Sequence, residues 1–402
     1  MPSPKEFAKE FAEIPGLRSA ERHDIEAGMI RRSSGLVLFW LAGVWAAQAG
    51  TFPLRYTTEG ATSTFPLPLE KSEVIFKAEP KYAGAEVVRS LLYLSGDKKD
   101  FIAFACDMES RTLYVDLNRN LDLTDDPDGV FQSATDRWSR EFKNIRIPVE
   151  QGDRRRELLV DILIYRSNYG RYTVKSSWES DAVPIGDRTY RMAVVDDGDG
   201  VVNRRDALFL TPVTEGGGDA AAAQVELKAP ASLVLDGQAW RFSYELAADG
   251  QTLALSVEPS SPRLQEVELT GENVERLVLE SDKTAAVYFR PDQSISLPPE
   301  SYTAEVWVRM TDGERSSLWH ARRVSFRLSE KNESVSWRVG GPIVSTLSHA
   351  LSGSQLSFNQ ATRGADGASY SLDSSSGVKF GKPKLRVKKA GKVIHVGEFE
   401  YG

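Results

Sequence analysis

Residues 240–257 read WRFSYELAADGQTLALSV, and this stretch indicates the fold class. Apolar and polar side chains alternate over residues 240–245 and again over residues 253–257. Alternation with a period of two places one face of a β-strand toward a core. Because Ala248–Gln251 contains an Asp-Gly pair between the two runs, we expect a β-hairpin here.

The same alternation recurs along the chain after Gly50, whereas helical periodicity is scarce there. It occurs over 304–310, over 324–328 and in the two runs 385–387 and 393–396. Short strands separated by turn residues are typical of β-sandwiches and barrels. We therefore predict an all-β fold with two or three β-sandwich-like domains.

Two polar segments suggest where these domains meet. Gly216–Asp219 reads as a linker, and Ser329–Ser334 reads as a second connection. The sequence thus predicts a first β domain over 50–215, a sandwich-like domain over 225–330 and a small C-terminal β domain over 331–402. The first domain would carry two acidic loops of the calcium-binding type.

The composition is that of an ordinary globular protein. Hydrophobic residues make up 41% of the 402 residues, which is enough for substantial cores. The net charge of −7 disfavours a general nucleic-acid binder. Cys106 is the one cysteine, so the chain forms no intramolecular disulfide, and we expect a buried, unreactive thiol.

An export signal is expected over residues 29–49. A basic pair precedes a short apolar run, and an Ala-Gln-Ala triplet ending at Ala49 follows it. This order is typical of a cleaved secretory signal peptide, and the apolar run is short for the alternative, a membrane anchor. We expect export to the periplasm, cell surface or extracellular space, with no stable membrane insertion after cleavage. Residues 1–28 then read as an extension from a start codon assigned too early, with Met29 as the true start.

Residues 114–126 read YVDLNRNLDLTDD and place a polar oxygen on every second residue. An EF-hand-type loop beginning at Asp116 has this spacing, because calcium binds six to eight oxygens of carboxylates, amides and carbonyls. The candidate metal ligands in this first acidic loop are Asp116, Asn118, Asn120, Asp122, Thr124 and Asp126.

Two features of the first acidic loop depart from the calcium pattern. Leu121 stands where a glycine is expected for the sharp turn, and Pro127 stands where a bidentate glutamate is expected. The segment 111–115 before the loop reads as a strand and not as a helix. A polar turn between two strands is therefore the alternative, since Asp and Asn favour turns.

Residues 195–206 read VDDGDGVVNRRD and form a second acidic loop, with strands expected on both sides. Asp199-Gly200 matches positions five and six of the calcium pattern, and Asp196 can replace Val195 at position one if the loop is one residue shorter. Asp-Gly also favours a simple hairpin turn. The candidate ligands are Asp196, Asp197, Asp199, Val201, Asn203 and Asp206. Whether the two loops form one site or two stays open.

These segments resemble a poorly characterised group of predicted secreted bacterial proteins, which are β-rich and carry EF-hand-like D-x-N-x-D-G loops. The resemblance lies in YVDLNRNLDLTDD, in VDDGDGVVN, in LPPESYTAEVWV at 297–308 and in the terminal GEFEYG, and it covers most of the chain after the signal. It implies an exported β-rich protein with calcium loops, and it implies no known activity.

A row of basic residues stands near the C-terminus. Lys382, Lys384, Arg386 and Lys388 occupy alternate positions and so share one face of an expected strand. A solvated face that protects a sheet edge is the first interpretation. The alternative is contact with an acidic envelope polymer or glycan.

The sequence therefore predicts an exported calcium-binding β protein that acts as a binding or structural module. We assign no catalytic residues, because the histidines lack metal-ligand spacing and no phosphate loop or nucleophile elbow is present. The alternative function is that of a hydrolase of extracellular polymers that uses two paired carboxylates.

Overall fold

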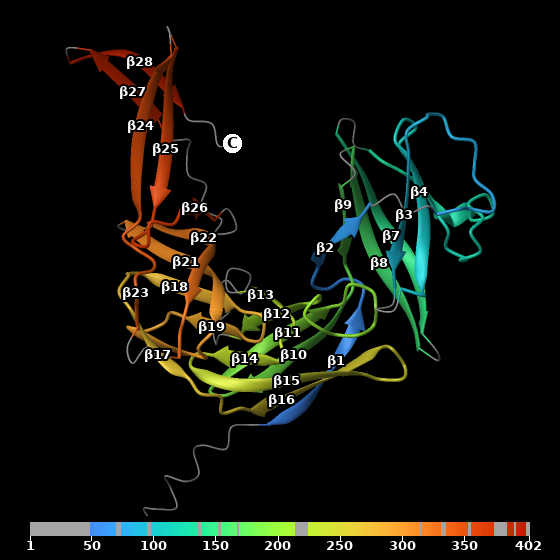
Figure 1. Cartoon of the computed structure of the whole chain (residues 1–402), viewed down its shortest axis with the longest axis horizontal. Coiled ribbons are helices and arrows are strands. Elements are labelled where there is room, and N and C mark those ends of the chain that lie inside the picture. Colours follow the sequence, from blue (N-terminus) through green and yellow to red (C-terminus); the bar gives the residue numbers. More distant parts are fainter. Residues whose placement is uncertain are drawn as a thin grey trace, which may run out of the picture. The chain divides into compact units, whose positions relative to one another are not determined.

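The fold is all-β, as the sequence predicted (Figure 1). The one helical element assigned in the described part of the chain is the 3₁₀ turn η1 (Pro127–Gly129), and no helix there is long and apolar enough to cross a membrane. The predicted extension, 1–28, and all of the predicted signal segment before Ala49 lie outside the described residues. The computed structural model describes residues 49–69, 74–94, 98–134, 138–151, 154–166, 169–213, 224–312, 315–330, 335–352, 355–373, 384–389 and 391–398.

Thirteen strands form one large sheet. In sheet order they are β13 (Val225–Lys228), β12 (Ala207–Pro212), β11 (Arg188–Val195), β10 (Ser177–Ile185), β1 (Gly50–Thr57), β16 (Thr252–Pro259), β15 (Gln238–Leu246), β14 (Ser232–Leu235), β19 (Ala285–Phe289), β18 (Val274–Glu280), β21 (Ser301–Asp312), β22 (Arg315–Arg327) and β26 (Ser371–Leu372). Neighbours pair antiparallel except β14 and β19, which are parallel.

Five smaller sheets complete the part of the fold that the structure describes. One four-stranded sheet has the order β2 (Ser63–Pro68), β9 (Tyr169–Val174), β8 (Arg154–Tyr165) and β7 (Ser139–Gln151). The other has the order β3 (Val87–Tyr93), β4 (Phe101–Asp107), β5 (Thr112–Val115) and β6 (Val130–Gln132). A three-stranded sheet contains β20 (Ser294–Leu297), β17 (Gln265–Leu269) and β23 (Val335–Trp337). Two separate hairpins are β24 (Val344–Ser352) with β25 (Gln355–Arg363), and β27 (Lys384–Lys389) with β28 (Lys392–Glu398).

The predicted hairpin at 240–257 is confirmed. β15 and β16 pair antiparallel with Leu246 opposite Leu253, and Gly250 in the turn has the positive φ of +67° that glycine adopts without strain. The apolar members of the alternation, such as Phe242 and Leu255, are buried. The other alternating runs are also strands, in β21, β22 and the β27–β28 hairpin.

Three hydrophobic cores lie between the sheets. The two four-stranded sheets share the first core, which includes Phe104 and Ile162. The second core gathers one face of the large sheet around Trp178 and Trp240. The third core packs the three-stranded sheet against the large sheet and includes Tyr302. This layering of sheets gives the fold its sandwich-like character.

Strands β11 and β12 belong to two cores at once. Val194 and Leu208 point into the second core, whereas their neighbours Val195 and Ala207 point into the first. Successive side chains of a strand lie on opposite faces, so a strand between two layers is apolar on both. The connection between β11 and β12, which is the second acidic loop, therefore begins and ends where the two cores meet.

Strand pairing crosses the predicted boundary near 215. β1 lies in the large sheet between β10 and β16, with Leu54 opposite Leu253. Two strands of the predicted C-terminal segment also join earlier ones, since β23 pairs with β17 and β26 pairs with β22. The predicted linker Gly216–Asp219 lies outside the described residues.

Cys106 lies on β4, and its side chain is fully buried in the first core. Burial raises the pKa of its thiol to about 12. The burial of Cys106 is thus confirmed, and a thiol with so high a pKa is neutral near pH 7.

A core truncation tests the first core. Leu113 on β5 is fully buried, and we expect Leu113→Ala to lower the free energy of unfolding by about 2–5 kcal/mol, because the removed methyl groups leave a cavity. Val130→Ala on the paired strand β6 is the control, since Val130 is 45% exposed and its truncation should cost less than about 0.5 kcal/mol. Urea unfolding measures both, and equal losses would contradict the assignment of this core.

Candidate metal centre in the second acidic loop

The second acidic loop joins two adjacent antiparallel strands. Val195, the last residue of β11, is opposite Ala207, the first residue of β12, so the loop closes on itself. Gly198 and Gly200 have positive φ values of +107° and +74°, which glycine adopts at little cost. The predicted strands on both sides of the loop are confirmed.

Asp196 holds the loop from inside. Its carboxylate accepts hydrogen bonds from the backbone N–H of Gly198 at 3.0 Å and of Gly200 at 3.0 and 3.2 Å. The side chain of Val195 instead packs in the first core. Asp196 thus takes the place of the first residue of the calcium pattern, as the sequence allowed for a loop one residue shorter.

A buried ion pair fixes Asp196 to the neighbouring sheet. Nη2 of Arg156, on β8, lies 2.6 Å from Oδ2 of Asp196 and also donates to the carbonyl oxygen of Gly198 at 3.1 Å. The side chains of Arg156 and Asp196 are only 3% and 1% exposed. The guanidinium lies over the ring of Trp178, 5.0 Å from its centroid. Each buried charge is therefore compensated, as burial of an ion requires.

Asp206 closes the other end of the loop. One carboxylate oxygen accepts from the N–H of Asp197 at 2.8 Å, and the other accepts from the N–H of Asn203 at 2.6 Å. Burial, and the negative charge of Asp196, raise the pKa of Asp206 well above its usual range. Because both of its oxygens bind loop amides, Asp206 acts first as a structural anchor of the loop.

Three carboxylates converge in this loop. Oxygens of Asp196, Asp197 and Asp199 all lie within 4.8 Å of one another, and no other such group of acidic, histidine or cysteine side chains occurs in the described part of the chain. Burial raises the pKa of Asp197 to about 6, and the charges of Asp196 and Asp199 add to the effect. Burial likewise raises the pKa of Asp199. The three carboxylates therefore repel one another in a partly desolvated position.

Arg205 compensates part of this repulsion from the solvent side. Its Nη2 pairs with Asp199, and its Nε lies 3.6 Å from an oxygen of Asp197. The arginine side chain is 58% exposed, whereas that of Asp199 is 4% exposed. The side chain of Arg205 can thus move away from Asp197 and Asp199 without disturbing a core. These carboxylates can then accept another cation.

Val201 and Asn203 are the two remaining candidate metal ligands of this loop. The side chain of Val201 is 60% exposed, and its carbonyl oxygen accepts a hydrogen bond from Asn203 at 2.6 Å. The amide oxygen of Asn203 accepts from the N–H of Arg205 at 2.9 Å. Neither residue belongs to the carboxylate group. Val202, which follows Val201, is partly buried and packs against the second core.

The first acidic loop has a similar beginning. The buried carboxylate of Asp116 accepts from the N–H of Asn120 at 3.0 Å and of Leu121 at 2.9 Å. Leu121 has a φ of +64°, the left-handed conformation that a glycine at this position would adopt. Leu123, two residues further on, is buried. The loop therefore makes the sharp turn without its glycine.

The rest of the first loop forms hydrogen bonds within itself. The side-chain amides of Asn118 and Asn120 donate to Asp125 at 3.0 and 2.7 Å. The amide oxygen of Asn120 accepts from the N–H of Asp122 at 2.7 Å, and the carboxylate of Asp122 accepts from the hydroxyl of Thr124 at 2.5 Å. These bonds support the polar-turn interpretation, because the Asp and Asn side chains satisfy donors of the loop itself.

Asp126 is one of three acids, with Asp125 and Asp128, that could replace the missing glutamate of the twelfth position. Its Oδ2 is buried and accepts no hydrogen bond in the described part of the chain. Burial, and the nearby charge of Asp116, raise the pKa of Asp126. Pro127 follows it as the first residue of η1. No residue of this loop joins the carboxylate group of the second loop within the described residues.

The sequence interpretation missed two arginines. Arg205 stands next to the predicted ligand Asp206, and its charge was a visible signal. Arg156 is separated from Asp196 by a long stretch of chain and meets it only because β8 packs against this loop. Nothing in the local sequence indicates that contact.

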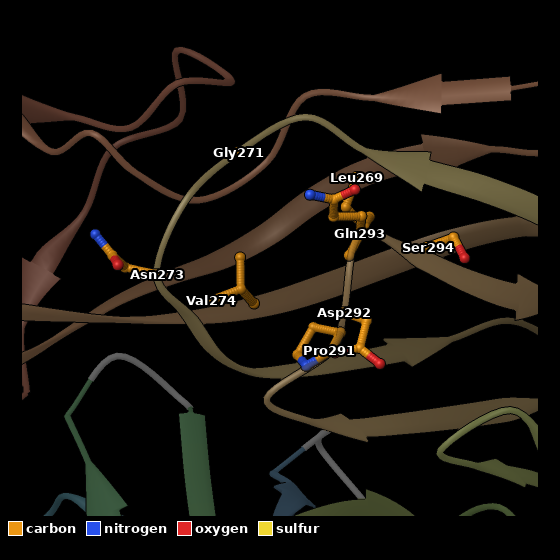
Figure 2. A pocket seen from close by; sticks show the side chains of 8 residues that line it. All are labelled: Leu269, Gly271, Asn273, Val274, Pro291, Asp292, Gln293 and Ser294. Carbon is orange, nitrogen blue, oxygen red and sulfur yellow. The ribbon is translucent and has the colours of Figure 1, made fainter. Parts of the chain in front are cut away.

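One further hollow lies between the β17–β18 and β19–β20 connections (Figure 2). It has a volume of about 550 Å³, and Asp292 is the single acidic residue among those that line it. A hydrolase of the predicted kind needs two facing carboxylates. This hollow does not supply them. The lining residues are Leu269, Gly271, Asn273, Val274, Pro291, Asp292, Gln293 and Ser294.

Comparison of the chain with protein-family models, curated proteins and solved structures gave no match.

The buried ion pair can be tested by a double-mutant cycle. Arg156→Leu leaves the carboxylate of Asp196 buried without its partner, so we expect a loss of about 3–5 kcal/mol in the free energy of unfolding. Arg156→Leu combined with Asp196→Asn should lose less than the sum of the two single variants, because the charges compensate each other. Denaturant unfolding measures all three, and strict additivity would show that the pair is not coupled.

The crowded carboxylates predict a dependence of stability on pH. Because burial raises the pKa of Asp197 in the folded state to about 6, above its usual range, its stabilising contribution is complete below about pH 4 and is lost as pH rises through 6. In buffer with a chelator, the free energy of unfolding should fall over this range, and Asp197→Asn should flatten the fall. Asp187→Asn, at an exposed turn position, is the control that should keep it.

Proposed function

We propose that this protein is an exported calcium-binding β module in which calcium at the second acidic loop has a structural role. The observation that carries the proposal is the convergence of the carboxylates of Asp196, Asp197 and Asp199 within 4.8 Å. Such a group could hold a metal ion. Calcium would neutralise charge that Arg156 and Arg205 compensate only in part.

The chemistry of the donors supports a hard cation. All three side chains offer carboxylate oxygens, which suit calcium, magnesium and manganese better than metals that prefer imidazole or thiolate. The carbonyl of Val201 and the amide oxygen of Asn203 are further oxygens of the same loop. Calcium accepts such irregular sets of six to eight oxygens more readily than magnesium does.

The position of the loop supports a structural role. The strands that it joins contribute Val195 and Ala207 to the first core and Val194 and Leu208 to the second. A cation that holds this connection would stabilise the folded state in proportion to its occupancy. Extracellular modules bind calcium with dissociation constants of about 10⁻⁴–10⁻³ M, which suits an exported protein. Export, and the resemblance to secreted β-rich proteins, stay predictions from residues 29–49 and from the loop motifs. The hydrolase alternative also stays a prediction.

Calorimetric and thermal titration of the full chain after Ala49 tests the proposal. With a dissociation constant in that range, about 10 mM calcium should raise the free energy of unfolding by about 1.4–2.7 kcal/mol. The variant Asp197→Asn/Asp199→Asn should stay folded and lose both the heat of binding and the thermal shift. The variant Asp125→Asn/Asp126→Asn changes the first loop by the same charge and should keep both.

The outcome of this titration separates the two loops. A stoichiometry of one that is lost in the second-loop variant supports the proposal. Binding that is lost only in the first-loop variant would place the site there and contradict it. A chain that stays folded and shows no heat and no thermal shift at millimolar calcium would remove the calcium function altogether.

Substitution of Arg205 should strengthen calcium binding, whereas substitution of the carboxylates should abolish it. Its guanidinium competes with a cation for Asp197 and Asp199, so Arg205→Gln should raise calcium affinity. An exposed ion pair contributes up to about 1 kcal/mol, so we expect an increase of about fivefold at most. Arg191→Gln, a change of the same charge at an exposed position of β11, is the matched control. Weaker calcium binding in Arg205→Gln would contradict a site on these carboxylates.

A further inference from the structure

The β27–β28 hairpin, which is red in Figure 1, has a charge opposite to that of the whole protein. Residues 384–398 carry a net charge of +4, whereas the complete chain carries −7. The one acidic residue of the hairpin is Glu398. The basic residues are Lys384, Arg386, Lys388, Lys389 and Lys392.

The register of the hairpin pairs Lys384 with Glu398 and leaves the other basic residues without an acidic cross-strand partner. Arg386 lies opposite Val396 and Lys388 lies opposite Val393, so neither faces a carboxylate. Arg386, Lys388 and both valines are exposed. Lys389 lies opposite Lys392, and like charges in such a pair destabilise a hairpin. The arrangement costs stability and presents a basic, solvated face.

Protection of a sheet edge does not account for this face. The β24–β25 hairpin is also two-stranded and exposed, yet β24 contains no lysine, arginine, aspartate or glutamate, and β25 contains only Arg363. This chain therefore leaves one pair of hairpin edges almost uncharged and makes the other strongly basic. A requirement for charged edges would apply to both.

We propose that the β27–β28 hairpin binds an anionic polysaccharide through the carboxylate or sulfate groups of that polymer. Arg386 and Lys388 occupy alternate positions of β27, which places them on one face about 7 Å apart, a spacing suited to successive charged groups of a polymer. A two-stranded hairpin is marginal alone, so a polymer that neutralises it also stabilises it.

The composition of the hairpin favours a polysaccharide over two other polyanions. Residues 384–398 contain no phenylalanine, tyrosine or tryptophan. Single-stranded nucleic acid is usually bound by stacking on aromatic side chains, and membrane interfaces are usually anchored by tryptophan and tyrosine. Apart from the exposed Val393 and Val396, the hairpin offers charge and hydrogen-bond donors, which are sufficient for carboxylate and sulfate groups. This binding is independent of calcium, since it uses none of the loop carboxylates.

Fluorescence titration of the full chain after Ala49 with polygalacturonate, in buffer that contains a chelator, tests the proposal. We expect binding that weakens at least tenfold between about 50 mM and about 200 mM NaCl, because released counterions drive it. Arg386→Glu/Lys388→Glu should weaken binding at least tenfold at the lower salt concentration. The matched variant Arg263→Glu/Arg338→Glu changes two exposed arginines elsewhere by the same charge and should stay within twofold.

The controls decide between specific and general attraction. Equal weakening in both double variants would show that net charge alone is responsible and would overturn the proposal. Absence of polygalacturonate binding would overturn it as well, as would binding of phosphatidylglycerol vesicles or DNA that is tighter than binding of the polysaccharide. Circular dichroism checks that each variant is folded. The hairpin variant should lose polymer binding and keep the calcium titration unchanged. Either proposal can therefore fail without the other.

Discussion

The pair of Arg156 and Asp196 is the constraint on which the loop and its surroundings depend. It links β8, a strand of a four-stranded sheet, to the connection between two strands of the large sheet. Each member compensates a charge that would otherwise be buried alone, and Asp196 also orders the backbone at Gly198 and Gly200. The positions of Asp197 and Asp199 follow from this anchor, because they stand on the backbone that it holds.

Local patterns in the sequence predict the strands well and their assembly poorly. Alternation at 240–257 indicates a hairpin because the two strands adjoin in the chain. The contact of β1 with β16, and of Arg156 with Asp196, joins residues that are distant in sequence, and no local pattern encodes it. The three hydrophobic cores likewise depend on which faces of the sheets meet in space. For the same reason, strand pairing crosses the domain boundary that the composition suggested.

The acidic loops illustrate the same limit at the scale of single residues. The motif identified Asp197 and Asp199 from spacing, and it allowed Asp196 as a substitute for Val195. The motif counted Leu121 against a calcium loop, yet the backbone of Leu121 has the positive φ that a glycine would adopt. Motifs describe which residue types usually satisfy a geometry. They cannot state when surrounding hydrogen bonds impose that geometry on an unfavourable residue.

The place of β1 has a consequence for the order of folding. This strand is the link between β10 and β16, and its partner residues on β16 lie roughly two hundred positions along the chain. Pairings of such high contact order form slowly, because a long segment must lose its freedom before they do. Until β1 is in place, β10 and β16 each have an unpaired edge that can capture another chain. Completion of this sheet is thus the step at which aggregation competes most directly with folding.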